Sequence, residues 1–290
     1  MSRRGILLFA AMCVIWGIPY LMIRVAVREL APVTLVFMRT GLAALLLVPI
    51  AAARGELRPL LPCWKPLLAY TAIEVAIPWI LLAEAETKLS SSLAGLLLAA
   101  VPLVGAVLVA FTGTRERQGL RRWFGLLVGL IGVLALVGLD VGDVKPIGLV
   151  EIMIVAVCYA VGPILFDRYL GGVPALGVVA ASLGLTAIAY APLAAFRWPG
   201  EMPTAHVLES VVGLSFICTA LAFLIFFALI REVGPVRATV ITYVNPAVAA
   251  VAGIALLGES LTVGMVVGFV LVLIGSVIAT GRGPEPVPEP

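Results

Sequence analysis

The sequence contains two copies of one pattern of prolines, arginines, glutamates and glycines. A shift of 144 residues superimposes Pro19 on Pro163, Arg24 on Arg168 and Pro102 on Pro246. A shift of 143 superimposes Glu116 on Glu259, Gly125 on Gly268 and Gly132 on Gly275. About half of the chain therefore repeats the other half, and any fold must accommodate this duplication.

The composition places both copies in a lipid bilayer. Of the 290 residues, 62% are apolar and only 12% are charged, which is too little polar surface to cover a water-soluble domain. A membrane-spanning helix needs roughly 20 apolar residues. Ten segments meet this need, at about 5–27, 32–53, 66–86, 90–111, 121–139, 147–169, 174–196, 204–230, 235–256 and 262–280.

Five spans in each copy give the second copy the opposite orientation in the membrane, because five is an odd number. We therefore expect an all-α membrane protein with ten transmembrane helices in two five-helix inverted-topology repeats, at 1–144 and 145–281. Such inverted repeats are typical of secondary transporters. The proline-rich tail, 282–290, is expected to be disordered.

The positions of Lys and Arg predict the orientation. With the N-terminus and the C-terminus on the cytoplasmic side, thirteen of the nineteen basic residues fall on that side. No basic run with interleaved aromatic residues occurs, so no nucleic-acid partner is expected.

Several motifs then resemble one family. They are Trp16-Gly17-x-Pro19, Arg39, Val101-Pro102, Asn245-Pro246 and Gly258-Glu259 before a glycine-rich last span. Together they resemble the EamA-type repeat of the drug/metabolite transporter superfamily, over nearly the whole chain. The first copy departs from the pattern, because Arg115-Glu116 replaces Gly-Glu.

The resemblance implies a secondary transporter of the bacterial inner membrane. It implies export of aromatic and other neutral amino acids, or of similar small metabolites, by alternating access at a midplane cavity. A multidrug or cationic-metabolite transporter with proton antiport is the alternative, and a passive channel is a further one. Small-molecule substrate and lipid are the expected partners.

Prolines inside the spans indicate where the transport path lies. Lipid cannot satisfy the backbone groups that a proline frees, so such residues are tolerated where protein or cavity water replaces the hydrogen bonds. The expected helix breaks or gating positions are Pro19, Pro78, Pro102, Pro163 and Pro246. The alternative is that these prolines only kink the helices for packing.

Polar and aromatic residues near these prolines are the candidates for substrate binding. They are Trp16, Tyr20, Trp79, Tyr159, Tyr243 and Asn245. Aromatic side chains can form the wall of an amino-acid site and attract a cation to their faces. The competing interpretation is the aromatic belt at the membrane interface.

Two ionisable residues lie well inside the spans. Arg39 is about 10 Å from the outer end of its span and Glu74 about 13 Å from the inner end of the next. They are expected to form an intramembrane ion pair, or Glu74 serves proton coupling. Glu84, Glu86, Glu151 and Asp167 lie near span ends and are expected to be solvated.

An enzyme is not indicated, because no catalytic motif occurs and the single histidine, His206, is peripheral. Cys13, Cys63, Cys158 and Cys218 lack metal-binding spacing, so neither a metal nor a cofactor is predicted. The motifs Gly125-x-x-x-Gly129 and Gly264-x-x-x-Gly268 allow close helix packing. We expect this packing within one subunit, giving a monomer, with a dimer as the alternative.

Overall fold

The computed structural model describes residues 2–111, 120–138 and 145–280. Within those ranges all regular structure is helical and no strand occurs. Nine helical stretches there are long and apolar enough to cross a membrane, and one further apolar helix, Ile241–Leu257, is shorter. The chain is an all-α membrane protein, as the sequence predicts. The nine long stretches are Arg3–Ala26, Pro32–Ala53, Arg58–Glu86, Ser91–Leu108, Leu120–Gly138, Pro146–Leu170, Ala175–Phe196, Ala205–Val233 and Val263–Thr280.

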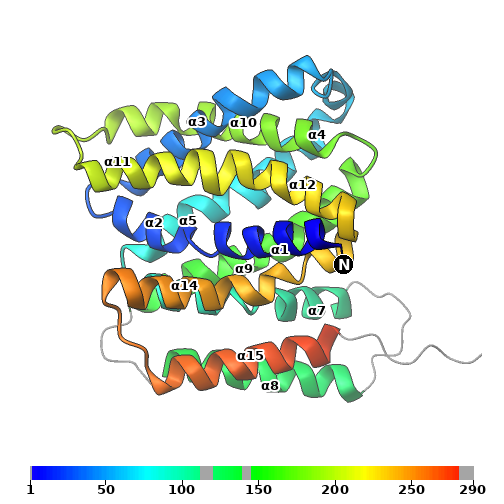
Figure 1. Cartoon of the computed structure of the whole chain (residues 1–290), viewed down its shortest axis with the longest axis vertical. Helices are drawn as coiled ribbons and strands as arrows, with labels where there is room; N and C mark the ends of the chain where they lie inside the picture. The colour runs from blue at the N-terminus through cyan, green and yellow to red at the C-terminus, as the bar shows by residue number, and fades with distance from the viewer. Residues whose placement is uncertain (1, 112–119, 139–144, 281–290) are drawn as a thin grey trace, which may run out of the picture.

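Several spans are built from more than one helical segment (Figure 1). In the first half the segments are α1 (Arg3–Ile15), α2 (Pro19–Ala26), α3 (Pro32–Ala53), η1 (Arg58–Cys63), α4 (Trp64–Tyr70), η2 (Thr71–Ala76), α5 (Ile77–Glu86), α6 (Ser91–Leu98), α7 (Val101–Phe111) and α8 (Leu120–Gly138). In the second half they are α9 (Pro146–Leu165), η3 (Phe166–Leu170), α10 (Ala175–Phe196), α11 (Ala205–Val212), η4 (Gly213–Leu221), α12 (Ala222–Val233), α13 (Pro235–Ala238), α14 (Ile241–Leu257) and α15 (Val263–Thr280).

Helices from the two halves pack against each other in a symmetric pattern (Figure 1). The main pairs are α3 with α10, α6 with α14, α8 with α15, α1 with α12 and α5 with α9. The first three pairs join the second, fourth and fifth spans of each half to their counterparts. In the other two pairs, the first span contacts the eighth and the third span contacts the sixth. Exchanging the two halves converts one of these pairs into the other. This is the packing that a two-fold axis between two five-span repeats would produce.

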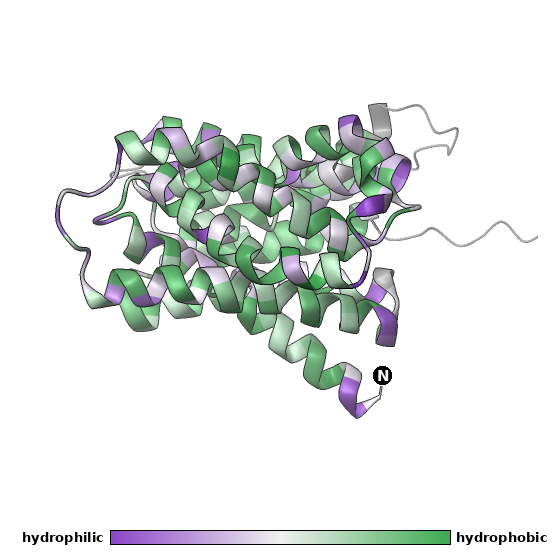
Figure 2. Ribbon diagram, turned by 90° about the horizontal axis from the view of Figure 1, so that it is seen from above, coloured by the Kyte–Doolittle hydropathy of each residue, from purple (hydrophilic) through white to green (hydrophobic). Residues whose placement is uncertain are grey.

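The outer surface of the bundle is apolar. Leu45, Ile188 and Leu256 are 74%, 72% and 70% exposed, although all three lie inside apolar spans. Hydrophobic residues occupy most of the length of the helices, and hydrophilic residues are concentrated near the two ends of the bundle (Figure 2). Lipid is the solvent that such a surface requires.

Proline begins a helical segment in three spans of the first half. A turn at Trp16–Ile18 separates α1 from α2, which begins at Pro19. Pro78 lies in the first turn of α5, directly after η2, so the backbone there changes from π-helical to α-helical without a gap and the predicted break is not observed. Pro102 lies at the start of α7, after a turn at Ala99 and Ala100.

The predicted breaks at Pro163 and Pro246 are not observed. Pro163 lies inside the continuous helix α9 and Pro246 inside the continuous helix α14. The physical reason is that proline removes only one helical hydrogen bond and has a helical φ, so a helix can continue through it with a bend. The two halves thus differ at these repeat-related positions.

The third and eighth spans contain π-helical segments at equivalent places. Shifting η2 by 144 residues places it on 215–220, inside η4. Pro78 has no counterpart, because Ala222 occupies the matching position. Proline is therefore not the common cause of these wide turns, which are frequent at functional sites.

Glycines bring the backbones of α8 and α15 into direct contact. A Cβ atom added to Gly132 would lie 2.8 Å from the carbonyl oxygen of Gly268, and one added to Gly275 would lie 2.6 Å from that of Gly125. The two glycine stripes therefore face each other within one chain, as expected for packing inside the subunit.

Gly275→Ala should push α15 away from α8, because the added methyl group meets backbone atoms that cannot rotate away. We expect a loss of about 1–3 kcal/mol of stability, typical of overpacking. Thermal unfolding of the purified protein in detergent measures it. Gly138→Ala on α8 is the control, since its new Cβ meets nothing within 4 Å. Equal melting temperatures for the two variants would contradict the close packing.

Candidate functional site

Arg39 is a buried cation at the interface between the two halves. It lies on α3 and is 8% exposed. Its guanidinium carbon stands 3.8 Å from the centre of the Trp79 ring, and its Nε donates a hydrogen bond of 3.0 Å to Oγ1 of Thr219 on η4. Stacking on an aromatic face and a hydrogen bond both stabilise a charge removed from water. Among the described residues, Nε is the only guanidinium nitrogen of Arg39 with a protein acceptor.

The predicted ion pair between Arg39 and Glu74 is not formed. No ion pair joins them in the described part of the chain, and Oε2 of Glu74 has no hydrogen-bond partner there. The reason is topological: α3 packs against α10 and η4 of the other half, rather than against η2, which carries Glu74. The carboxylate lies instead against Gly162 of α9.

Three of the six predicted binding residues gather near Arg39. Trp79 lies under its guanidinium group, and Tyr20 and Tyr159 pack against the same core cluster as Trp79, on helices that contact α5. They come from α5, α2 and α9, so both halves contribute. Arg39, Trp79, Tyr20 and Tyr159 form what we call the arginine cluster.

The other three predicted binding residues lie outside this cluster. Trp16 packs against Phe226 and Phe223, with ring centres 4.7 and 5.8 Å away. Asn245 is buried, and its side-chain amide is oriented so that it donates to the carbonyl oxygens of Ile241 and Cys13, at 3.0 and 3.1 Å. Tyr243 places its hydroxyl 3.4 Å from Oγ1 of Thr280, on α15.

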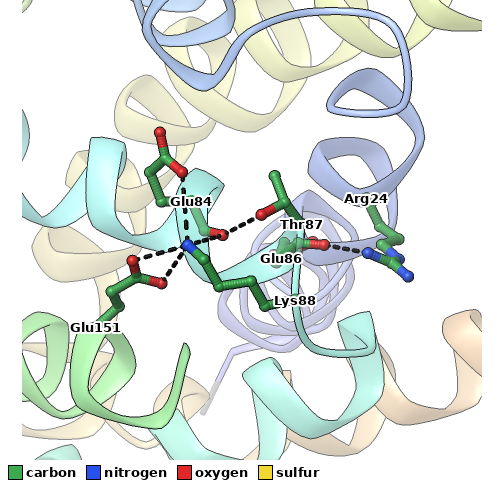
Figure 3. A network of polar contacts seen from close by, with 6 residues as sticks. All are labelled: Arg24, Glu84, Glu86, Thr87, Lys88 and Glu151. Atoms are coloured by element: carbon green, nitrogen blue, oxygen red, sulfur yellow. Dashed lines mark hydrogen bonds and ion pairs between the residues drawn. The ribbon is translucent and has the colours of Figure 1, made fainter. Parts of the chain in front are cut away.

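Glu86 is a buried acid that the sequence analysis assigned to solvent. Its side chain is 0% exposed, and neither carboxyl oxygen has a hydrogen-bond partner among the described residues. The prediction was wrong because α2 and α6 pack against α5 and cover its end. Arg24 donates to the backbone carbonyl of Glu86 and not to its carboxyl group (Figure 3). No residue pattern around Glu86 indicates this burial, since a residue at a span end is ordinarily exposed to water.

Polar contacts tie the two halves together at one end of the bundle. We call it the distal end, with the connectors 27–31, 87–90, 197–204 and 258–262, opposite to the N-terminus (Figure 1). Nζ of Lys88 binds Glu151 at 2.8 Å and lies 3.5 Å from Glu84 (Figure 3). Glu29 accepts hydrogen bonds from the backbone and hydroxyl of Thr204.

The strongest of these contacts is a serine clamp on Glu259. Its carboxylate accepts hydrogen bonds of 2.5–3.0 Å from the backbone amides and the hydroxyls of Ser91 and Ser92. These serines form the first turn of α6, where free amides and the helix dipole attract an anion. The contact joins the connector after α14 to the opposite half. Glu116, the repeat-related acid, lies outside the described residues.

The serine clamp should make stability depend on pH. Burial alone would raise the pKa of Glu259, but the hydrogen bonds from Ser92 and Ser91 outweigh it and lower the pKa below its ordinary value of 4.5. A group with a lowered pKa stabilises the folded state above its unfolded pKa, and this stabilisation is lost as the pH falls through the folded pKa.

Glu259→Gln should therefore lower the melting temperature at neutral pH, and the difference from wild type should begin to close once the pH falls below 4.5. Thermal unfolding across a pH series measures this. Glu201→Gln, on an exposed residue of the same distal end, should change little at any pH. A difference that persists unchanged at low pH would refute the charged clamp.

Two other features of the described residues do not suggest a site. A groove along α9 is lined by Leu149, Val150, Met153, Ile154 and Val157, so it offers only apolar contact and belongs to the lipid-facing surface. No group of three or more His, Cys, Asp and Glu residues in the described ranges could hold a metal ion.

Comparison with known proteins identifies the family to which the chain belongs. The model of the EamA-like transporter family matches residues 3–138 and again residues 146–281. The uncharacterized inner membrane transporter YedA of Escherichia coli (strain K12) is 29% identical over 259 residues, which cover 87% of this chain and 82% of YedA. YedA of Escherichia coli O157:H7 matches equally.

A solved crystal structure supports the fold. It superposes with a TM-score of 0.67 and 20% sequence identity, covering 97% of both chains. The specific likeness to the amino-acid exporter YddG and the cytoplasmic location of the termini stay predictions. The double family match, over almost the whole length, establishes that the chain belongs to the EamA-like transporter family, as a multi-pass membrane transporter.

Proposed function

We propose that this transporter exports aromatic and other neutral amino acids, or similarly small amphiphilic metabolites, across the bacterial inner membrane. The observation that carries the proposal is Arg39. It is a buried cation whose terminal guanidinium nitrogens have no acceptor among the described residues. Guanidinium groups bind carboxylates through paired hydrogen bonds, which are stronger than neutral ones. The solute carboxylate would bind these nitrogens.

The aromatic residues around Arg39 suit the rest of such a solute. Trp79, Tyr20 and Tyr159 combine large apolar faces with polar edges, and they come from both halves of the chain. A site shared by the two halves changes its access when the halves rock against each other. Binding of the solute at this interface therefore supports alternating access as the mechanism.

The polar contacts between the halves support a resting state that is closed at the distal end. Glu259, Lys88 and Glu29 each bind the opposite half there. At the other end, among the described residues, the hydroxyl of Ser2 donates a hydrogen bond to Glu232 of the opposite half. Breaking the distal contacts would then accompany opening to that side.

Arg39→Gln should lower the exchange of neutral amino acids at least about tenfold, because one charge-assisted hydrogen bond contributes about 1.5–3 kcal/mol. Counterflow of labelled amino acids in proteoliposomes measures it. Arg54→Gln, on an exposed arginine at the end of the same helix, is the matched control. Arg39→Lys keeps the charge but not the planar group, so it should exchange at an intermediate rate.

Folding is checked by the yield of monodisperse protein for each variant. Wild-type exchange by a well-folded Arg39→Gln variant would exclude Arg39 as the anion site. Failure of the wild-type protein to exchange any amino acid would reject the proposed substrate class.

Proton antiport is a second candidate, and the unpaired state of Glu74 favours it. This carboxyl group lies in the π-helical segment η2, inside a span, without the arginine partner that would hold it charged. Buried acids of this kind mark proton pathways in membrane proteins.

If Glu74 couples protons, Glu74→Gln should stay folded and keep amino-acid exchange but lose its response to an imposed pH gradient. Proteoliposomes with and without a pH gradient test this directly. Wild-type protein that does not concentrate solute in response to a proton gradient alone would favour facilitated export instead.

A further inference from the structure

Glu86 is an ionisable group of the described structure whose carboxyl group has no partner. It ends α5, is completely buried, and leaves both carboxyl oxygens without a hydrogen-bond donor. A buried polar group normally has a partner, because burying it without one costs several kcal/mol on solvent-transfer scales, and far more when it is charged. The carboxyl group of Glu86 therefore needs a partner that the described residues do not supply.

The charged groups near Glu86 are already engaged elsewhere. Arg24 donates to its backbone carbonyl (Figure 3). Arg39 stacks on Trp79 and donates to Thr219. Glu259 has the same charge and is held by the serine clamp.

Lys88, two residues along the chain, also cannot serve. Its ammonium group is bound between Glu151 and Glu84 on the far side of α5 from Arg24 (Figure 3). Among the described residues, no side chain donates a hydrogen bond to either carboxyl oxygen of Glu86.

Glu86 nevertheless lies on the side of α5 that carries the arginine cluster. It follows Trp79 by two helical turns, so both side chains lie on one face of α5. The Arg39 guanidinium stands 3.8 Å from the centre of the Trp79 ring. A carboxyl group and a guanidinium edge without protein partners, both on this side of the helix, have the charge pattern that complements a zwitterion.

We propose that Glu86 is the subsite for a primary ammonium group of the transported solute. The inference rests on the proposed function, in which Arg39 takes the carboxylate. The solute ammonium donates to the carboxyl oxygens of Glu86 that the protein leaves free, and its carboxylate accepts from the terminal nitrogens of Arg39. The preferred substrates are therefore α-amino acids, rather than amines or carboxylic acids of the same size.

Three ligands that share one ring separate the two subsites: phenylalanine, 2-phenylethylamine and 3-phenylpropionate. Their affinities for the purified transporter are measured by thermal stabilisation in detergent, where bound ligand raises the melting temperature. Wild type should bind phenylalanine more tightly than either analogue. Glu86→Gln should weaken phenylalanine and phenylethylamine at least about tenfold, as loss of a charge-assisted hydrogen bond requires, and leave phenylpropionate unchanged.

Glu84→Gln is the matched control, because Glu84 lies on the same helix as Glu86 and its side chain is 43% exposed. It should bind all three ligands like wild type. Equal binding of phenylethylamine to wild type and Glu86→Gln, or no binding of either amine-bearing ligand to wild type, would overturn the inference.

A chemical test on the wild-type protein avoids any folding defect of the variants. A membrane-permeant carbodiimide modifies buried carboxyl groups, and peptide mass spectrometry locates the modified residues. Phenylethylamine should slow the modification of Glu86 but not that of Glu74, the internal control. Equal protection of both residues, or of neither, contradicts the ammonium subsite. If protection is selective while no amino acid is exchanged in liposomes, the subsite stands and the proposed export function fails.

Discussion

The exclusion of water from the membrane interior is the constraint on which this structure depends. Hydrocarbon cannot solvate a guanidinium group, so Arg39 must find its stabilisation in protein. It finds it in an aromatic face from the first half of the chain and a hydroxyl group from the second. The side chain of Arg39 thereby joins the two halves inside the membrane.

The same constraint explains which features of the fold were predictable. Ten apolar segments, too long and too continuous for a soluble protein, predicted an all-α membrane protein with nearly the observed boundaries. The 144-residue offset indicated the duplication, and three of the main helix pairs between the halves join counterparts. The spans could be predicted from the length of apolar runs, which the bilayer thickness fixes, whereas the repeat needed the matched prolines, arginines, glutamates and glycines.

The contacts of particular side chains were less predictable, because they depend on which helices become neighbours. Arg39 and Glu74 lie on consecutive spans, so sequence proximity suggested a pair, yet α3 packs against the opposite half. Glu86 has the sequence context of a wet span end, and only the packing of α2 and α6 removes it from water. Pro163 and Pro246 were predicted as breaks because each lies inside a span and removes a helical hydrogen bond, although a proline does not always interrupt a helix. Trp79, Tyr20 and Tyr159, in contrast, do lie around the buried arginine.

The serine clamp has a consequence for the energetics of the transport cycle. The positions related to Ser91 and Ser92 by the 144-residue shift are Pro235 and Val236, which carry no hydroxyl group, and proline also lacks an amide hydrogen. These two positions therefore cannot donate the hydroxyl hydrogen bonds that Ser91 and Ser92 donate to Glu259. If the protein alternates between two access states, as we propose, identical copies would make those states equal in free energy, and this difference between the copies would stabilise one of them. The protein would then return to that state faster than it leaves it, so a molecule that arose from a symmetric duplication would acquire a preferred waiting state.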